Sequence, residues 1–267
     1  MYPEIFVKLN NVLDKIGLST FSILVGIGIV VMLSYIINSF EKKHNYSRKA
    51  TNKFLIFLAI SLAVTYGFAS FFDAFFHFLD DGVFEGGITF IAGFIGGIVC
   101  FVLLIYIFLP EERKNIMNIL NIIIPGVVLA HAIGRLGCFS VGCCYGMPTD
   151  SIFGVYFPDG TNAYYDGIRE HIHPTQLYES FFLFVLYFIL NYVGKVKENK
   201  FACYLIGYGL FRFILERFFR GDNRGALLGF PPSEILSIFL VICGISLLGY
   251  KIVHQRKHHE LLSEGQE

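Results

Sequence analysis

Seven stretches of hydrophobic residues alternate with shorter polar segments along this chain. An α-helix needs about 20 apolar residues to cross a bilayer, and stretches of this kind lie at about residues 17–38, 54–76, 89–109, 119–134, 177–194, 201–217 and 234–250. The fourth is short and contains Pro125, whereas the sixth carries Arg212 and Glu216 within an apolar frame. The pattern predicts an all-α polytopic membrane protein with seven transmembrane helices.

The composition supports this fold class. Hydrophobic residues make up 55% of the 267 residues and charged residues only 16%, whereas soluble domains carry about 25% charged residues. The net charge is zero, which argues against a nucleic acid as partner. The first apolar stretch lacks the basic flank and the cleavage site of a signal peptide, and we therefore expect a retained span there.

The lysines indicate how the chain is oriented in the membrane. Apart from Lys8 and Lys15, all of them lie in the loops after the first, third and fifth expected spans or in the C-terminal tail. Basic residues favour the cytoplasmic side, so we expect the N-terminus outside and the C-terminus in the cytoplasm. Residues 1–250 then form one transmembrane domain with a small extracytoplasmic cap at 135–176, followed by a polar cytoplasmic tail at 251–267.

Most arginines, by contrast, gather on the expected outer face. They are Arg135, Arg169, Arg212, Arg217, Arg220 and Arg224. A guanidinium group forms paired hydrogen bonds with phosphate or carboxylate, and a charge at the edge of an apolar segment requires a partner. Two interpretations stay open: the arginines bind an anionic lipid headgroup, or they pair with acidic residues and lock the helices together. The acidic residues concerned are Glu179, Glu216, Asp222 and Glu234.

Five short segments between residues 84 and 238 carry a family resemblance, and several of them are rich in glycine, arginine or cysteine. The segments are FEGGITFIAGFIGG at 84–97, GRLGCFSVGCCYGMPT at 134–149, HPTQLYE at 173–179, FRFILERFFRGD at 211–222 and PSEILSI at 232–238. In this order they resemble the signature segments of the prolipoprotein diacylglyceryl transferase family. The resemblance also covers the seven-span plan.

The resemblance implies a transferase of the bacterial cytoplasmic membrane that acts at the outer leaflet. Its reaction passes the diacylglyceryl group of phosphatidylglycerol to the thiol of a lipobox cysteine in a prolipoprotein signal peptide. A thioether forms and glycerol phosphate is released. The expected partners are therefore the anionic phospholipid and the signal peptide, and we assign neither a cofactor nor a metal ligand.

The resemblance also assigns candidate catalytic residues. Arg135 matches the family's essential arginine and Arg212 its second functional arginine. Fixed arginines suit a reaction whose leaving phosphate ester gathers negative charge. Glu216 follows Arg212 by four residues and is placed to orient or neutralise it. Arg220 lies one turn further on, so we expect these three residues on one helix face.

Further candidates flank the two central motifs. Gly134 and Gly137 flank Arg135, and His173, Gln176, Tyr178 and Glu179 belong to the segment that opens the fifth expected span. The glycines allow either close approach of a ligand or helix packing, and Gln176 and Glu179 either cap the helix or reach the site. His131, on the same helix face as Arg135, is a candidate general base.

The chain departs from the family pattern at chemical positions. Ile91 stands where the family has a histidine, Cys138 and Val141 stand where it has asparagines, and Cys143 stands where it has a glutamate. Several acids, bases and polar anchors of the family are therefore absent, which leaves the proton-handling part of the reaction without its usual residues.

Three cysteines now occupy this region, namely Cys138, Cys143 and Cys144. With His131, His171 or His173 nearby they suit a soft metal, a disulfide is permitted outside the cytoplasm, Cys143 is a candidate catalytic thiol, and small soft residues also serve packing. Two alternative functions follow: a thiol- or metal-dependent membrane protein on the same scaffold, or a non-catalytic lipid-binding homologue.

Overall fold

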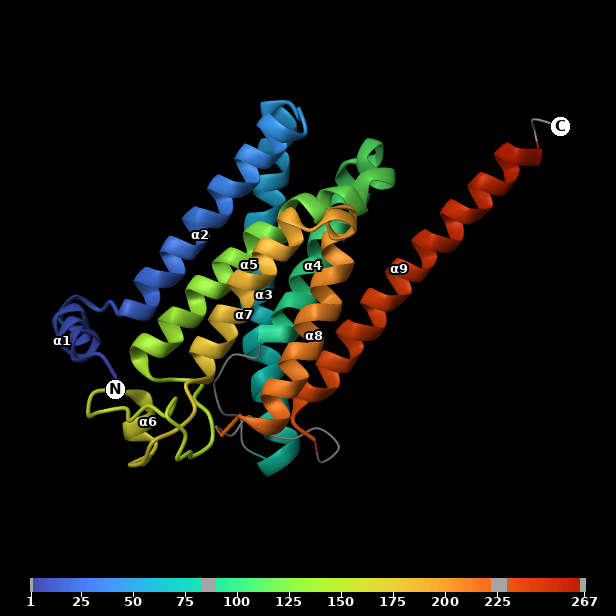
Figure 1. The fold of residues 1–267 in the computed structure, drawn as a ribbon. Helices are drawn as coiled ribbons and strands as arrows, with labels where there is room; N and C mark the ends of the chain where they lie inside the picture. The colour runs from blue at the N-terminus through green and yellow to red at the C-terminus, as the bar shows by residue number, and fades with distance from the viewer. Residues whose placement is uncertain (1, 83–89, 222–229, 265–267) are drawn as a thin grey trace.

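The computed structural model describes residues 2–82, 90–221 and 230–264. Within these residues the regular structure is helical, apart from isolated β-bridges in the segment between α5 and α7 and beyond α8 (Figure 1). The helices are α1 Glu4–Leu13, α2 Thr20–Asn38, α3 Arg48–Asp81, α4 Phe90–Phe108, α5 Ile116–Val141, α6 Asn162–Tyr165, α7 Thr175–Tyr192, α8 Lys200–Phe218 and α9 Pro232–Glu264. The expected all-α class is confirmed, and each of the seven apolar stretches forms a helix.

Five segments are long and apolar enough to cross a membrane by themselves. They are Thr20–Lys43, Arg48–Leu79, Phe90–Phe108, Pro110–Val141 and Pro232–His254. The two remaining long helices, α7 and α8, fall short of this because they carry buried polar residues such as Glu179 and Arg212.

Helix α5 is the centre of the bundle. It packs against α2 on one side and α7 on the other, while α8 packs against α9 and α3 packs against α4. Small residues bring the helices together, as expected for packing inside a membrane. A Cβ atom at Gly97 of α4 would lie 2.0 Å from Thr65 Oγ1 of α3. A Cβ atom at Gly137 of α5 would lie 3.2 Å from the Phe21 ring of α2.

The end of α5 corrects the sequence analysis. The expected span ended at 134 and the expected cap began at 135, yet the helix continues through Arg135 to Val141 despite Pro125. It stops at Gly142, which has the left-handed φ of 72° that favours glycine. The Gly142 N–H donates to Phe139 O and the Cys143 N–H to Cys138 O, both at 3.1 Å. The segment between α5 and α7, which we call the cap, therefore begins at residue 142.

The cap is fastened to the bundle by its own small core and by α1. Its core contains Tyr2, Phe139, Phe157 and Ile172, all of them buried. Asn10 of α1 donates from Nδ2 to Ser140 O at 2.9 Å. Its Oδ1 atom accepts from the Thr20 N–H at 2.9 Å and from the Thr20 hydroxyl at 2.8 Å. One side chain thus joins α1, α2 and α5.

The basic turns lie at the other end of the bundle. Ser39–Lys43, Pro110–Asn115 and Gly194–Glu198 form short turns that connect the long helices, and Figure 1 shows the connections opposite the end that carries α1 and α6. Lys251 Nζ of α9 donates to Glu198 O at 3.2 Å, which brings the start of the expected tail to the same end. Helix α9 itself continues to Glu264.

Candidate functional site

A buried carboxylate, Glu179, is the centre of the polar cluster in the bundle. It lies in the second turn of α7 and is 0% exposed. Its Oε2 atom accepts from Arg212 Nη1 at 2.9 Å and lies 3.1 Å from Arg135 Nε. Its Oε1 atom accepts from the Tyr208 hydroxyl at 2.8 Å. Three helices, α5, α7 and α8, therefore meet at one acidic side chain.

Two further expected residues extend this cluster. His131 Nε2 lies 3.4 Å from Glu179 Oε1 and 3.3 Å from Arg135 Nε, and its ring is stacked on Phe90 with the ring centres 3.8 Å apart. Arg212 Nη2 lies 2.8 Å from Glu216 Oε2, so the expected i,i+4 contact is present. The His131 and Glu216 side chains are both buried.

The cluster combines two guanidinium groups with two carboxylates. Burying one such group alone would carry a large desolvation penalty, whereas opposite charges with hydrogen bonds between them offset it. The Arg135–Glu179 contact also fixes the Arg135 side chain, because Nε is held by the carboxylate. Nη1 of the same group lies 3.9 Å from Cys138 Sγ. A pre-oriented guanidinium of this kind binds an anion without first reorganising.

Beside the cluster lies a cavity of about 1090 Å³ bounded by α2, α3, α4 and α5. Most of its lining is apolar and comes from side chains such as Val25, Leu58, Phe94 and Ile123. Its polar lining includes Arg135, Cys138, Cys143, Cys144, Asn162 and Asp166, together with Asp73, His77 and His131. The cavity therefore combines a largely apolar lining with a group of polar residues, as the binding site of an amphiphile requires.

The residues that open α7 hold the loop after α5. Gln176 Nε2 donates to Cys143 O at 2.6 Å and Thr175 Oγ1 donates to Cys144 O at 2.8 Å. His173 Nδ1 and the Tyr178 hydroxyl form a hydrogen bond at 3.1 Å. Of the two roles left open for this segment, Glu179 reaches the site, whereas Gln176 shapes the loop beside it.

The candidate glycines differ in their surroundings. Gly134 lines the cavity, and a Cβ atom there would meet nothing within 4 Å. Gly137 faces Phe21 at 3.2 Å and serves the packing of α5 on α2. Only Gly134 therefore has space beside it for a ligand.

Arg220 does not share a helix face with Arg212 and Glu216, and that expectation is wrong. Helix α8 ends at Phe218, and Arg220 lies beyond it in an isolated β-bridge with Gly146. It is nevertheless buried, with 8% exposure. The main-chain pairing with the cap, rather than helical spacing, brings it to this end of the bundle.

Two arginines further from the cluster have local partners. The Arg169 guanidinium lies over the Tyr164 ring, 3.6 Å from its centre, and Arg217 pairs with Glu234 at 3.8 Å. These contacts favour the helix-locking and surface interpretation for both. Arg224 and Asp222, as well as residues 84–89 of the first resembling segment, lie outside the described residues. Ile91 of α4 is within the described residues and is buried in the hydrophobic core of the bundle.

The surroundings of Cys143 favour the protonated form of its thiol when no ligand is bound. Hydrogen bonds with Cys138 and Cys144, together with burial, raise the pKa of the Cys143 thiol above its ordinary value. A thiol in that state is a poor nucleophile. The structure therefore gives no support to Cys143 as an unaided catalytic thiol.

Sequence reasoning missed Tyr208 and Phe90. Tyr208 is fully buried and donates to Glu179, and it precedes Arg212 by one helical turn, which is the signal that would have found it. Phe90 stacks on His131 from α4, a helix distant in sequence from α5. Nothing in the local sequence of Phe90 indicates this contact.

Comparison with known proteins adds to this geometry. The family model described as prolipoprotein diacylglyceryl transferase matches residues 9–250. A phosphatidylglycerol–prolipoprotein diacylglyceryl transferase of Clostridium tetani is 38% identical over 158 residues, which cover 57% of this chain and 62% of the relative. One of the same name from Rickettsia conorii is 29% identical over 262 residues, which cover 91% of this chain and 97% of the relative.

The stronger similarity is confined to part of the chain. A second Clostridium protein, phosphatidylglycerol–prolipoprotein diacylglyceryl transferase 2 of Clostridium perfringens, is 36% identical over 150 residues, or 55% of this chain and 57% of the relative. The chain thus matches less than two thirds of the length of the Clostridium relatives, whereas the Rickettsia relative is matched over almost its whole length at lower identity.

Proposed function

The chain belongs to the prolipoprotein diacylglyceryl transferase family, and we propose that it transfers the diacylglyceryl group of phosphatidylglycerol to the cysteine thiol of a prolipoprotein lipobox. The reaction forms a thioether and releases glycerol phosphate. One observation carries the proposal: Arg135, held by the buried Glu179, lines a largely apolar cavity of about 1090 Å³.

The cavity suits the two parts of a phospholipid. Its apolar walls accept acyl chains, because transfer of apolar surface from water is favourable. Arg135 is part of its polar lining and supplies paired N–H donors for the phosphate. As the bond from carbon to the phosphate ester oxygen breaks, negative charge gathers on that phosphate, and a fixed guanidinium stabilises the transition state more than the bound lipid.

The other members of the cluster act through Arg135. Glu179 fixes its side chain, Arg212 and Tyr208 hold Glu179, and Glu216 balances the charge of Arg212. His131 contacts both the Arg135 guanidinium and the Glu179 carboxylate. We assign these residues to positioning and Arg135 to direct contact with the lipid phosphate.

We further infer a multi-pass protein of the bacterial cytoplasmic membrane with seven spans and the cap outside. The seven long helices support this count, and the lysine-containing turns at the end opposite the cap support the orientation. Arg135 is six residues from the end of α5, or about 9 Å at the rise of an α-helix. The site then lies at the depth of the outer leaflet.

The test is the mass of a lipobox peptide. The purified full-length protein is incubated with the peptide in vesicles that contain phosphatidylglycerol, beside Arg135→Ala and the control Arg217→Ala, which removes a half-exposed arginine outside the cluster. We expect a diacylglyceryl mass gain with wild type and control, and none with folded Arg135→Ala. Full activity of Arg135→Ala, or no gain with wild type, would overturn the proposal.

A further inference from the structure

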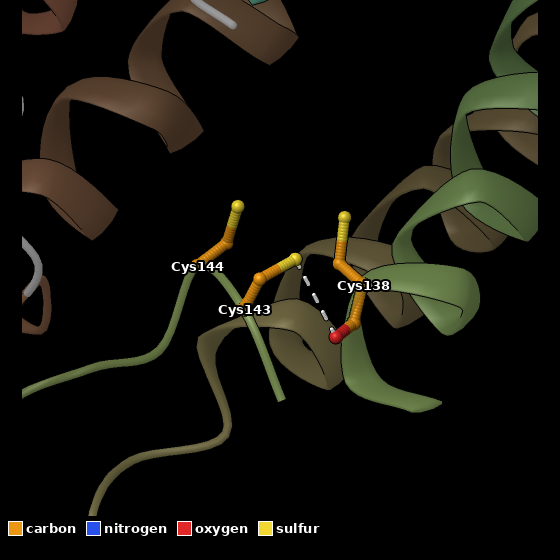
Figure 2. A group of neighbouring side chains, drawn as sticks. All are labelled: Cys138, Cys143 and Cys144. Carbon is orange, nitrogen blue, oxygen red and sulfur yellow. Dashed lines mark hydrogen bonds between the residues drawn. The ribbon is translucent and has the colours of Figure 1, made fainter. Parts of the chain in front are cut away.

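Three cysteines surround one point in the polar lining of the cavity. Cys138 lies in the last turn of α5, and Cys143 and Cys144 follow the helix end. Their sulfur atoms all lie within 4.8 Å of one another, and Figure 2 shows the three side chains side by side. Each is a thiol rather than half of a disulfide. The cluster also lines the cavity that contains Arg135.

The backbone explains why these sulfurs meet. The turn at Gly142 closes the helix by hydrogen bonds from Gly142 N–H to Phe139 O and from Cys143 N–H to Cys138 O. This pattern places the second residue after the helix beside its last turn. Cys144 then adopts a φ of 61°, a left-handed conformation that a non-glycine residue rarely takes. Such conformations occur where the surrounding structure enforces them.

Side chains from α7 fix the same loop. Gln176 and Thr175 hold the carbonyl groups of Cys143 and Cys144 at 2.6 and 2.8 Å. On the other side, Arg135 Nη1 lies 3.9 Å from Cys138 Sγ. The cysteines are therefore held in place independently of any ligand, as a metal site requires.

We propose that Cys138, Cys143 and Cys144 bind a zinc ion whose fourth coordination position faces the cavity. Tetrahedral Zn²⁺ with Zn–S bonds of about 2.3 Å places sulfur atoms about 3.8 Å apart, so the observed cluster closes on the ion with shifts of about 1 Å or less. Three protein ligands with one open position are the arrangement of catalytic zinc sites. Bound zinc keeps its thiol ligands deprotonated, which reverses the effect of burial on Cys143.

The open position suits the acceptor, and this step depends on the proposed function. The lipobox thiol binds zinc through sulfur and releases its proton to water, which supplies the thiolate that the reaction needs. The sulfur then attacks the glyceryl carbon that bears the phosphate. A C–S bond forms, the C–O bond breaks, and the electron pair leaves on the oxygen of glycerol phosphate. The step is a substitution at carbon and requires no external oxidant or reductant.

The first measurement is the metal content of the reduced, full-length protein in detergent after equilibration with zinc. We expect about one zinc per chain, and loss of the ion in Cys138→Ser, Cys143→Ser and Cys144→Ser variants that keep wild-type helicity. The control Cys203→Ser changes a cysteine of α8 outside the cluster and retains zinc. A reduced wild type without zinc, or a triple serine variant that still binds it, overturns the inference.

Cobalt provides a readout that does not depend on turnover or on the folding of any variant. Co²⁺ bound to the wild-type cluster gives strong thiolate charge-transfer absorption and the visible bands of a tetrahedral site. A lipobox cysteine peptide shifts these bands, and the same peptide with serine does not. Absence of tetrahedral bands, or equal shifts with both peptides, contradicts the proposed coordination.

Activity then separates this inference from the proposed function. Removal of zinc with a chelator abolishes diacylglyceryl transfer and zinc restores it. If the metal-free protein transfers as fast as the zinc-loaded protein, the zinc step is wrong and the transferase proposal stands. If the zinc-loaded protein binds the cysteine peptide but yields no thioether, the metal site stands and the transferase proposal fails.

Discussion

Replacing Glu179 by glutamine tests the electrostatic basis of the site. The change keeps the shape of the side chain but removes the negative charge that Arg135 and Arg212 share at 3.1 and 2.9 Å. Glu216 remains beside Arg212, so the variant leaves one positive charge buried without compensation. The Tyr208 hydroxyl loses a charged acceptor as well.

The expected loss of stability follows from this burial. Breaking a buried ion pair by removing one partner costs about 3–5 kcal/mol, which lowers the Tm by about 6–20 °C for a domain of this size. A double variant tests whether the loss is electrostatic in origin. Glu179→Gln combined with Arg135→Met leaves the Arg212–Glu216 pair and restores neutrality, so the double variant regains most of the lost Tm while the transferase activity stays absent.

Thermal unfolding followed by circular dichroism in one detergent measures these differences. The control is Glu4→Gln, which removes an exposed carboxylate of α1 that pairs only at the surface with Lys8, and we expect its Tm to equal that of the wild type. The reasoning is refuted if Glu179→Gln unfolds within a degree or so of this control, or if the double variant is no more stable than Glu179→Gln alone.

Two further changes test the packing around the site. Tyr208→Phe removes one hydrogen bond to the Glu179 carboxylate and should cost about 1.5–3 kcal/mol, measured by thermal unfolding, whereas an unchanged Tm would deny that the bond contributes. Gly97→Val places side-chain atoms against Thr65 of α3 and should cost about 1–3 kcal/mol by overpacking. Gly26→Ala, where a Cβ atom meets nothing within 4 Å, is the matched control, and equal stability of the two glycine variants would contradict the prediction.

The position and type of the long helices could be predicted because apolar length alone determines them. Each expected span is a helix, and Gly137 acts in the packing of α5 on α2, which is one of the two interpretations that the sequence left open. The end of α5 could not be found in this way. Arg135 looks like the edge of a span in its own sequence context, but Glu179, more than 40 residues later, neutralises it. A helix therefore continues where local hydropathy indicates a break.

The site was predictable in its residues but only partly in its geometry. The motifs identified Arg135, Arg212 and Glu179, and spacing identified the Arg212–Glu216 pair. Spacing failed for Arg220, because it assumed a helix that ends at Phe218. The central role of Glu179 was also not apparent, since it depends on how three helices meet. Contacts of this kind arise from tertiary packing, which a single sequence does not encode in any local pattern.

If the cavity binds a phospholipid as proposed, its position makes that lipid part of the packing of this protein. Helices α3 and α4 pack mainly on each other, and the cavity lies between this pair and the α2–α5 pair. Alkyl chains that enter the space complete the interior between the two pairs. The folded unit in a bilayer is then protein together with lipid, and each turnover exchanges a piece of its own interior. We therefore expect a detergent whose tail is too short to fill that space to weaken the fold without altering a single residue.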